Sequence, residues 1–213
     1  LLLALVAVPL PAQAQQDPLA IVRRAGNVDR GLSSLQADFV QVIEDTNLGD
    51  TLSRTGRLYQ AGQNNFAMRF TDPPDEAIVI DGRYSWFYTP STTPGQVLRM
   101  PLPSGGPVYG YNLLAWLLDR PHERYQSSVV RNDRLEGRAV TVVEMVPTVP
   151  DMPFTRAVVW LDKSDGLPRR IEIEETSGQH RTLTLRNLRA NVRTGDDTFR
   201  FEVPSGIKVI EQS

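Results

Sequence analysis

The residues that could perform acid–base or metal chemistry are few in this chain of 213 residues. His122 and His180 are its two histidines, and their separation matches none of the spacings at which paired histidines bind a metal. The chain has no cysteine, which excludes thiolate nucleophiles, thiolate metal sites and disulfides. It also has no nucleophile-elbow, phosphate-loop or dinucleotide-binding motif. The sequence therefore predicts no catalytic residue, no metal site and no cofactor.

One pair of carboxylates has a spacing that catalysis could use. Glu172 and Glu174 fall on the same face of a predicted strand, and glycoside hydrolysis requires two carboxylates in one cleft. Ile171 and Ile173 occupy the other face of that strand, so burial of the isoleucines turns both glutamates toward water. We therefore expect the two glutamates to be solvated and the chain not to be an enzyme.

The most informative pattern is the alternation of apolar and polar residues along the chain. Phe66, Met68 and Phe70 alternate with Ala67 and Arg69, which predicts a half-buried strand. Similar short strands are predicted at 35–44, 56–60, 78–80, 84–88, 97–100, 127–132, 139–146, 154–161, 170–175, 182–188, 199–203 and 208–210. Strands at such even spacing predict a mainly β fold, with one large antiparallel sheet or an incomplete barrel.

Two segments have helical patterns instead. Asp17 is a good N-cap, Pro18 suits the first helical position, and the apolar residues that follow recur at helical spacing. The segment 109–119 is apolar nearly all round, so this short helix is buried or covers something apolar. We interpret the two helices as a lid. The predicted lid residues are Ile21, Val22, Leu113, Leu114, Trp116 and Leu117.

A sheet of many strands under so small a helical cover is an arrangement that binds apolar ligands. We therefore expect an unclosed antiparallel β-barrel, a half-barrel whose apolar concave face is covered by a short helical lid. Any one of its apolar residues is more simply explained as ordinary core, so the lipid-binding cavity is a hypothesis about the whole set. The candidates are Phe39, Leu58, Phe66, Met68, Phe70, Ile78, Ile80, Trp86, Val158, Trp160, Ile171, Ile173, Leu183 and Leu185.

The beginning of the chain has the features of a signal peptide without its basic N-terminal region. Residues 1–10 are a short apolar run, and Pro11-Ala12-Gln13-Ala14 contains an A-x-A site with cleavage expected after Ala14. We expect a signal peptide at 1–14 and a single domain at 15–213. The formal net charge of -2 gives no basic excess for binding nucleic acid. We expect an exported monomer without stable membrane insertion.

Several motifs in the two halves of the chain point to one known family. The first half has Gly56-Arg57-Leu58-Tyr59, then FAMRFTDPPDE at 66–76 and IVIDGRYSWFYTP at 78–90. The pattern D-G-x-x-x-W-F-Y-x-P at 81–90 is the most specific of them. The second half has Trp160-Leu161-Asp162, Asp165-Gly166-Leu167-Pro168 and an ending F-x-F-x-V-P-x-G-x-K-V from residue 199. Over essentially the whole mature chain, the sequence resembles the outer-membrane lipoprotein carrier family, LolA.

The resemblance implies a function as well as a fold, an unclosed barrel with a helical lid over an apolar cavity. Members of the family take acylated lipoproteins from an inner-membrane ABC transporter, LolCDE, and carry them across the periplasm to the outer-membrane receptor LolB. Phe66 matches a family aromatic residue on the inner face, near the receptor-contact region. Gly62-Gln63 stands where many members have a basic residue followed by proline, which the family links to lid control and onward transfer.

Two other classes of protein share this fold. LolB has a similar fold but is anchored through an N-terminal cysteine, and this chain has no cysteine. Sensor domains of the RseB type also share the fold. A periplasmic module that binds a lipid or glycolipid, or that senses the state of the envelope, is therefore the alternative to a lipoprotein carrier.

Overall fold

The computed structural model describes residues 17–62, 64–102, 112–150, 152–195 and 197–212. The predicted signal peptide at 1–14 lies outside the described residues. The helices are α1 (Pro18–Gly31), α2 (Leu113–Leu118) and α3 (Pro121–Arg124). The strands are β1 (Leu35–Asp45), β2 (Asp50–Ala61), β3 (Asn65–Asp72), β4 (Ala77–Asp81), β5 (Tyr84–Tyr88), β6 (Gln96–Pro101), β7 (Tyr125–Leu135), β8 (Arg138–Pro147), β9 (Phe154–Asp162), β10 (Pro168–Glu175), β11 (Gln179–Ala190) and β12 (Lys208–Glu211).

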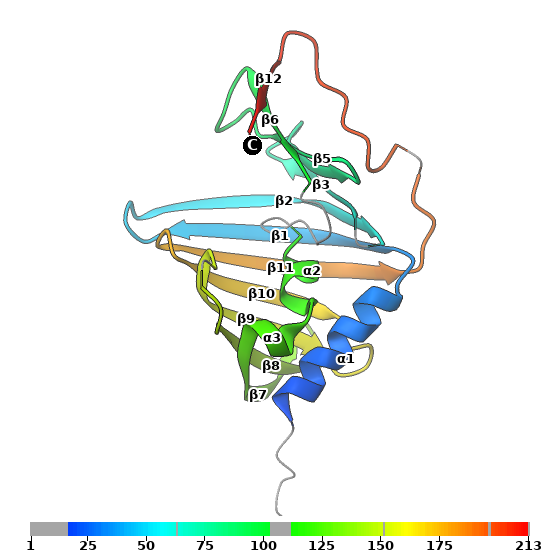
Figure 1. The fold of residues 1–213 in the computed structure, drawn as a ribbon, viewed down its shortest axis with the longest axis vertical. Helices are drawn as coiled ribbons and strands as arrows, with labels where there is room; N and C mark the ends of the chain where they lie inside the picture. The colour runs from blue at the N-terminus through cyan, green and yellow to red at the C-terminus, as the bar shows by residue number, and fades with distance from the viewer. Residues whose placement is uncertain (1–16, 63, 103–111, 151, 196, 213) are drawn as a thin grey trace, which may run out of the picture.

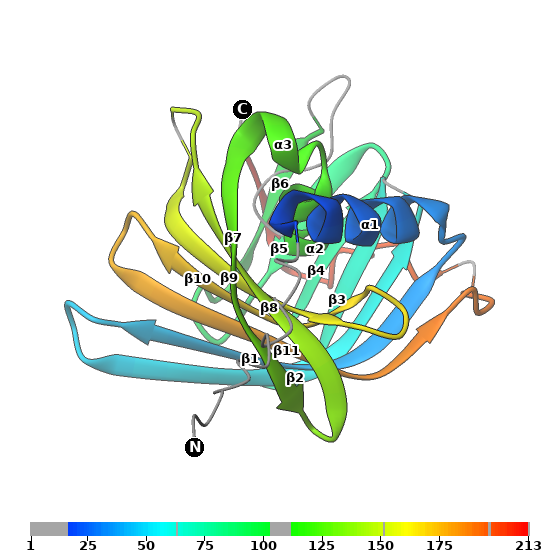
Figure 2. The same cartoon turned by 90° about the horizontal axis from the view of Figure 1, so that it is seen from below.

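All of these strands belong to one sheet of 12 strands, in the order β12-β6-β5-β4-β3-β2-β1-β11-β10-β9-β8-β7. Neighbouring strands are antiparallel except for β12, which runs parallel to β6. The sheet curls around α1 and α2 without closing into a barrel (Figures 1 and 2). The mainly β, unclosed half-barrel predicted from the sequence is therefore confirmed. Among the described helices, none is long and apolar enough to cross a membrane.

Helix α1 begins and ends at residues whose backbone groups are satisfied by local hydrogen bonds. The side chain of Asp17 caps it by accepting a 3.0 Å hydrogen bond from the backbone N–H of Leu19, and Pro18 occupies the first turn. Gly31 is the last helical residue, and the N–H of Leu32 donates to the carbonyl of Asp29. The buried residues of α1 are Val22, Ala25, Gly26 and Asp29, and Val22 and Ala25 belong to the same apolar cluster as the residues of the sheet.

The concave face of the sheet requires a glycine on β2, because neighbouring atoms leave no room for a side chain there. Phe39 and Phe70 meet edge to face, with ring centroids 5.2 Å apart, and Gly56 lies between them at an irregularity of the β2–β3 pairing. A Cβ at Gly56 would stand 2.2 Å from the carbonyl oxygen of Arg69 and 2.8 Å from the ring of Phe39. No side chain fits without moving backbone, so Gly56 permits the aromatic contact between Phe39 and Phe70.

The convex face of β3, β4, β5 and β6 is covered by the segment between β11 and β12 (Figure 1). Phe199 and Phe201 of this segment pack against a cluster that includes Trp86, and the Trp86 and Phe201 rings lie 5.5 Å apart. The prediction of a strand at 199–203 is wrong. The carbonyls of Thr198 and Arg200 accept hydrogen bonds from the Arg69 side chain, at 3.2 and 2.7 Å.

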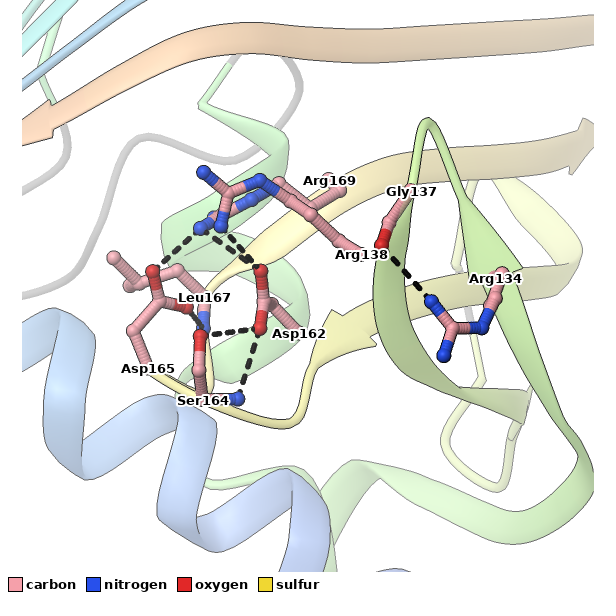
Figure 3. Close-up of polar contacts among 8 residues, drawn as sticks. All are labelled: Arg134, Gly137, Arg138, Asp162, Ser164, Asp165, Leu167 and Arg169. Carbon is pink, nitrogen blue, oxygen red and sulfur yellow. Dashed lines mark hydrogen bonds and ion pairs between the residues drawn. The ribbon is translucent and has the colours of Figure 1, made fainter.

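The turn between β9 and β10 is held beside α1 by a cluster of charges in which Asp162 and Arg169 are buried (Figure 3). The Asp162 side chain, 3% exposed, accepts hydrogen bonds from the N–H and hydroxyl of Ser164 and pairs with Arg138 at 3.0 Å and Arg169 at 3.2 Å. Arg169 also pairs with Asp165 at 2.5 Å. Burial raises the pKa of the Asp162 carboxyl, but these hydrogen bonds and ion pairs outweigh burial and hold it below its usual value.

We predict that Gly56→Ala destabilises the protein by about 2 to 3 kcal/mol, because the added methyl group overpacks a site without free space. Denaturant unfolding followed by circular dichroism measures the change. Gly31→Ala is the matched control, since no atom lies within 4 Å of a Cβ there. Equal stability of Gly56→Ala and the wild-type protein would contradict the packing argument.

We predict that Asp162→Asn lowers stability at pH 7 by about 2 kcal/mol, because the buried Arg169 loses one of its two carboxylate partners and keeps only Asp165. A carboxyl with a lowered pKa in the folded state stabilises the fold fully above its unfolded pKa of about 3.9, and this contribution is lost as the pH falls through the folded value. The deficit of the variant should therefore shrink below pH 4. Unfolding free energies between pH 2 and 7 measure it, and a deficit independent of pH would contradict the prediction. The control is Glu174→Gln, which removes an exposed ion pair with Arg156 and should change little.

Candidate functional site: the apolar concave face under α1 and α2

One buried cluster joins the concave face of the sheet to α1 and α2. Eleven of the predicted cavity residues belong to it: Phe39, Leu58, Phe66, Met68, Phe70, Ile78, Ile80, Ile171, Ile173, Leu183 and Leu185. The predicted lid residues Val22, Leu113, Leu114, Trp116 and Leu117 are in the same cluster, and Ile21 packs against it. The structure thus brings the two predicted sets together on one face. Binding of lipid by these residues stays a prediction.

Three predicted cavity residues lie on the opposite face of the sheet, so their assignment to the concave side is wrong. Trp86 pairs with Val79 across β4 and β5, and both belong to the cluster on the convex face. Val158 and Trp160 belong to a third cluster with Val140 and Val142 of β8. The physical reason is the alternation of side chains along a strand: Val158 and Trp160 lie between core residues of β9 and must point the other way.

Several members of the concave cluster are not among the cavity and lid residues predicted from the sequence. They are Leu35, Ala37, Phe87, Leu118, Tyr125, Val143, Met145, Phe154, Ala157, Val159, Leu161 and Leu167. The signal for Phe87 was available in the hairpin register, because Phe87 lies opposite Ile78 and cross-strand partners share a face. No comparable signal marks Phe154, which begins β9 and is recognised only by its contacts with α2 and β7.

Helix α2 rests on aromatic side chains that rise from β7 and β9. The rings of Trp116 and Phe154 meet edge to face at 5.0 Å, and Tyr125 stacks on Phe154 at 6.0 Å. The Tyr125 hydroxyl donates a 3.3 Å hydrogen bond to the carbonyl of Trp116. These contacts hold an apolar helix against an apolar face mainly by packing, and apolar burial of this kind is not directional. A ligand with an apolar surface could replace them.

The two covering helices touch each other through their backbones. A Cβ at Gly26 of α1 would stand 2.6 Å from the carbonyl oxygen of Leu118, the last residue of α2. Only a glycine allows α1 to lie this close to the end of α2. The cover over the concave face is therefore a pair of helices in direct contact.

Few polar side chains lie on this apolar face, and one of them connects α1 to the sheet. Gln60 of β2 donates a 3.2 Å hydrogen bond to the buried carboxyl of Asp29 on α1, and the Gln60 carbonyl oxygen is buried without a partner. Burial raises the pKa of Asp29, although the hydrogen bond from Gln60 and the charge of Arg30 oppose the shift. A carboxylate is poorly solvated here, so burial favours a neutral Asp29 in spite of the contact with Gln60.

The arrangement offers no cluster of groups for catalysis or metal binding in the described part of the chain. No three His, Asp or Glu side chains there come together as metal ligands. Glu174 pairs with Arg156 at 2.8 Å on the face away from Ile171 and Ile173, as predicted. His122 lies in α3, and His180 lies in β11 with its ring nitrogen 3.2 Å from Glu44. What the site can do is hold apolar groups away from water.

Comparison with known proteins identifies the family to which this fold and face belong. Residues 30–202 match the family described as outer membrane lipoprotein carrier protein LolA. The chain belongs to the LolA family. Family membership agrees with the resemblance in the sequence motifs, and it places the chain among carrier proteins rather than enzymes.

Individual relatives are distant but match over most of their length. The chain is 24% identical to the outer-membrane lipoprotein carrier protein of Methylobacillus flagellatus over 181 residues, 85% of this chain and 84% of the relative. It is 27% identical to that of Xanthomonas oryzae pv. oryzae over 186 residues, 85% of this chain and 83% of the relative.

Solved structures share the fold at lower sequence identity. An uncharacterised conserved protein of Thermus thermophilus superposes with a TM-score of 0.59 at 13% identity, covering 92% of this chain and 100% of that one. The MucA/MucB complex of Pseudomonas aeruginosa matches with a TM-score of 0.54 at 15% identity, covering 92% of this chain and 64% of that one. At these identities the likeness concerns the fold alone.

We predict that Asp29→Asn stabilises the protein at neutral pH by about 1 kcal/mol. A carboxyl whose pKa is raised in the folded state destabilises the fold as the pH rises above the unfolded pKa of about 3.9, and the full penalty is reached once the pH exceeds the folded value. Asparagine removes the penalty. Its side-chain oxygen can still accept the hydrogen bond from Gln60, and its NH2 group can donate one to the unpartnered side-chain oxygen of Gln60. Unfolding free energies between pH 3 and 8 measure the difference. Asp17→Asn, at the exposed cap of the same helix, is the control, and an equal gain in both variants would contradict the assignment to Asp29.

Proposed function

We propose that this chain is a periplasmic carrier of lipoproteins, which binds the acyl chains of its cargo on the concave face after displacing α2. The observation that carries the proposal is the apolar face of an unclosed sheet beneath helices that are themselves apolar toward it. Membership of the LolA family supports the same function. By this proposal residues 1–14 are removed on export, and residues 15–213 act as one carrier domain.

The energetics of lipid transfer explain why such a carrier is needed. Each methylene group buried from water contributes about 0.8 kcal/mol, so several acyl chains in bulk water cost tens of kcal/mol. An unaided lipoprotein therefore does not cross an aqueous compartment. Cargo must also be released, which favours a cover that opens over one that seals permanently. We propose that an inner-membrane ABC transporter loads the chain and that an outer-membrane receptor of the LolB type unloads it.

A second function is favoured by one observation, the likeness of the fold to MucB, which has been solved alone and with MucA. This alternative is a periplasmic module that binds a lipid or glycolipid, or senses the envelope, without delivering cargo. A transfer assay separates the two. Inner-membrane vesicles containing a labelled lipoprotein release it to a carrier when ATP is added, whereas a sensor module leaves the label in the vesicles.

We predict that a photo-crosslinking residue at Leu117 captures lipoprotein acyl chains in cells, because Leu117 is buried in the cluster under α2. The same residue at Glu172 should capture none, because Glu172 lies on the other face of β10. Mass spectrometry of the adducts gives the readout. Equal labelling at both positions, or no labelling at Leu117 in a protein that still carries cargo, would contradict the site.

A further inference from the structure

Two polar side chains interrupt the apolar concave face side by side. Gln41 follows Phe39 by two residues on β1, and Arg54 precedes Gly56 by two on β2, so both point to the concave side. They are direct partners in the β1–β2 register. Gln41 is 4% exposed and Arg54 is 8% exposed, which is unusual for a glutamine and an arginine without a structural reason.

Arg54 is fixed from one side only. Its Nε lies 3.5 Å from Oε2 of Glu76, whose side chain is fully buried, and its guanidinium lies over the Phe70 ring at 5.6 Å. Glu76 is fixed in turn, because its Oε1 accepts hydrogen bonds from the backbone N–H and the hydroxyl of Ser91. Glu76 is therefore a positioning residue, which contacts the guanidinium of Arg54 at Nε and leaves its two terminal nitrogens uncovered.

The remaining donors of this pair have no partner. Neither terminal nitrogen of Arg54 donates a hydrogen bond to a described residue, and neither is sealed from solvent. The same holds for the side-chain amide of Gln41. The terminal nitrogens of an arginine carry four N–H groups, and a glutamine amide carries two more. Donors without a partner among the described residues, side by side on an apolar surface, suit a ligand whose apolar chain ends in hydrogen-bond acceptors.

We propose that Gln41 and Arg54 form a polar subsite for the carbonyl oxygens of ester- or amide-linked acyl chains, whose hydrocarbon lies over Phe39 and Phe70. This deepens the proposed function and rests on it. Glu76 neutralises the charge of Arg54, so the subsite favours a neutral carbonyl over a carboxylate, which would stand near a second carboxylate. Binding energy from these hydrogen bonds distinguishes acyl chains from other hydrocarbon chains of equal length.

The test compares two soluble ligands that differ in one carbonyl group, 1-decanoyl glycerol and its ether analogue 1-decyl glycerol. The wild-type protein should bind the ester about tenfold more tightly by calorimetry, as expected for one or two net hydrogen bonds. Gln41→Leu, and Arg54→Lys, which keeps a charge beside Glu76 but loses the guanidinium fork, should each reduce this preference to about twofold or less. Affinity for the ether should not change.

The control variant is Gln60→Leu, which removes another buried glutamine of β2 that lies by α1 instead, and which should keep the full ester preference. Circular dichroism of each variant checks its folding. Equal binding of ester and ether by the wild-type protein overturns the subsite alone. Tighter binding of decanoate than of the ester overturns it in favour of a carboxylate site. Failure of all three ligands to bind overturns the proposed function as well.

Discussion

The concave face of the open sheet is apolar across most of its strands, and the described helices that can cover it are short. Helices α1, α2 and α3 have 14, 6 and 4 residues. Such a cover shields the face only if the helices lie directly on the sheet and against each other, which is why Gly26 meets the carbonyl of Leu118. Uncovering apolar surface costs about 25 cal/mol per Å², and an apolar ligand that takes the place of the cover recovers that energy. Cover and ligand therefore compete for the same surface.

Two pairs of polar side chains near this face connect elements of the fold, and they differ in strength. Asp162 and Arg169 fix the turn beside α1 with complementary charges, and the hydrogen bonds from Ser164 and Arg138 together with the charge of Arg169 hold the pKa of Asp162 below its usual value in spite of burial. Gln60 and Asp29 connect α1 to β2 with a single weak contact, which leaves one acceptor unused. The strong pairs thus lie within the sheet, whereas the polar contact between α1 and the sheet is weak.

The sequence predicted the fold well because alternation along half-buried strands is a local pattern. It predicted the concave face where one side of a strand is polar, as for Ile171 and Ile173 against Glu172. It failed on β9, where both faces are buried and alternation gives no contrast, so that Trp160 was assigned to the wrong side. It also failed at 199–203, since the alternating aromatic residues there cover β5 without the backbone ladder of a strand.

The covered convex face explains why an open sheet can expose a single apolar surface to a ligand. Phe199 and Phe201 close the convex side over β3 to β6, and the guanidinium of Arg69 fixes that segment through two backbone carbonyls. Over β9 and β10, the guanidinium groups of Arg131 and Arg170 lie within 5.8 and 5.7 Å of the Trp160 ring. The convex side is thus covered by the segment that contains Phe199 and Phe201 and by charged side chains. The concave side is covered by α1 and α2, which are held mainly by packing. Under the proposed function, the concave face is therefore the surface on which contacts with the helices are exchanged for contacts with a lipid.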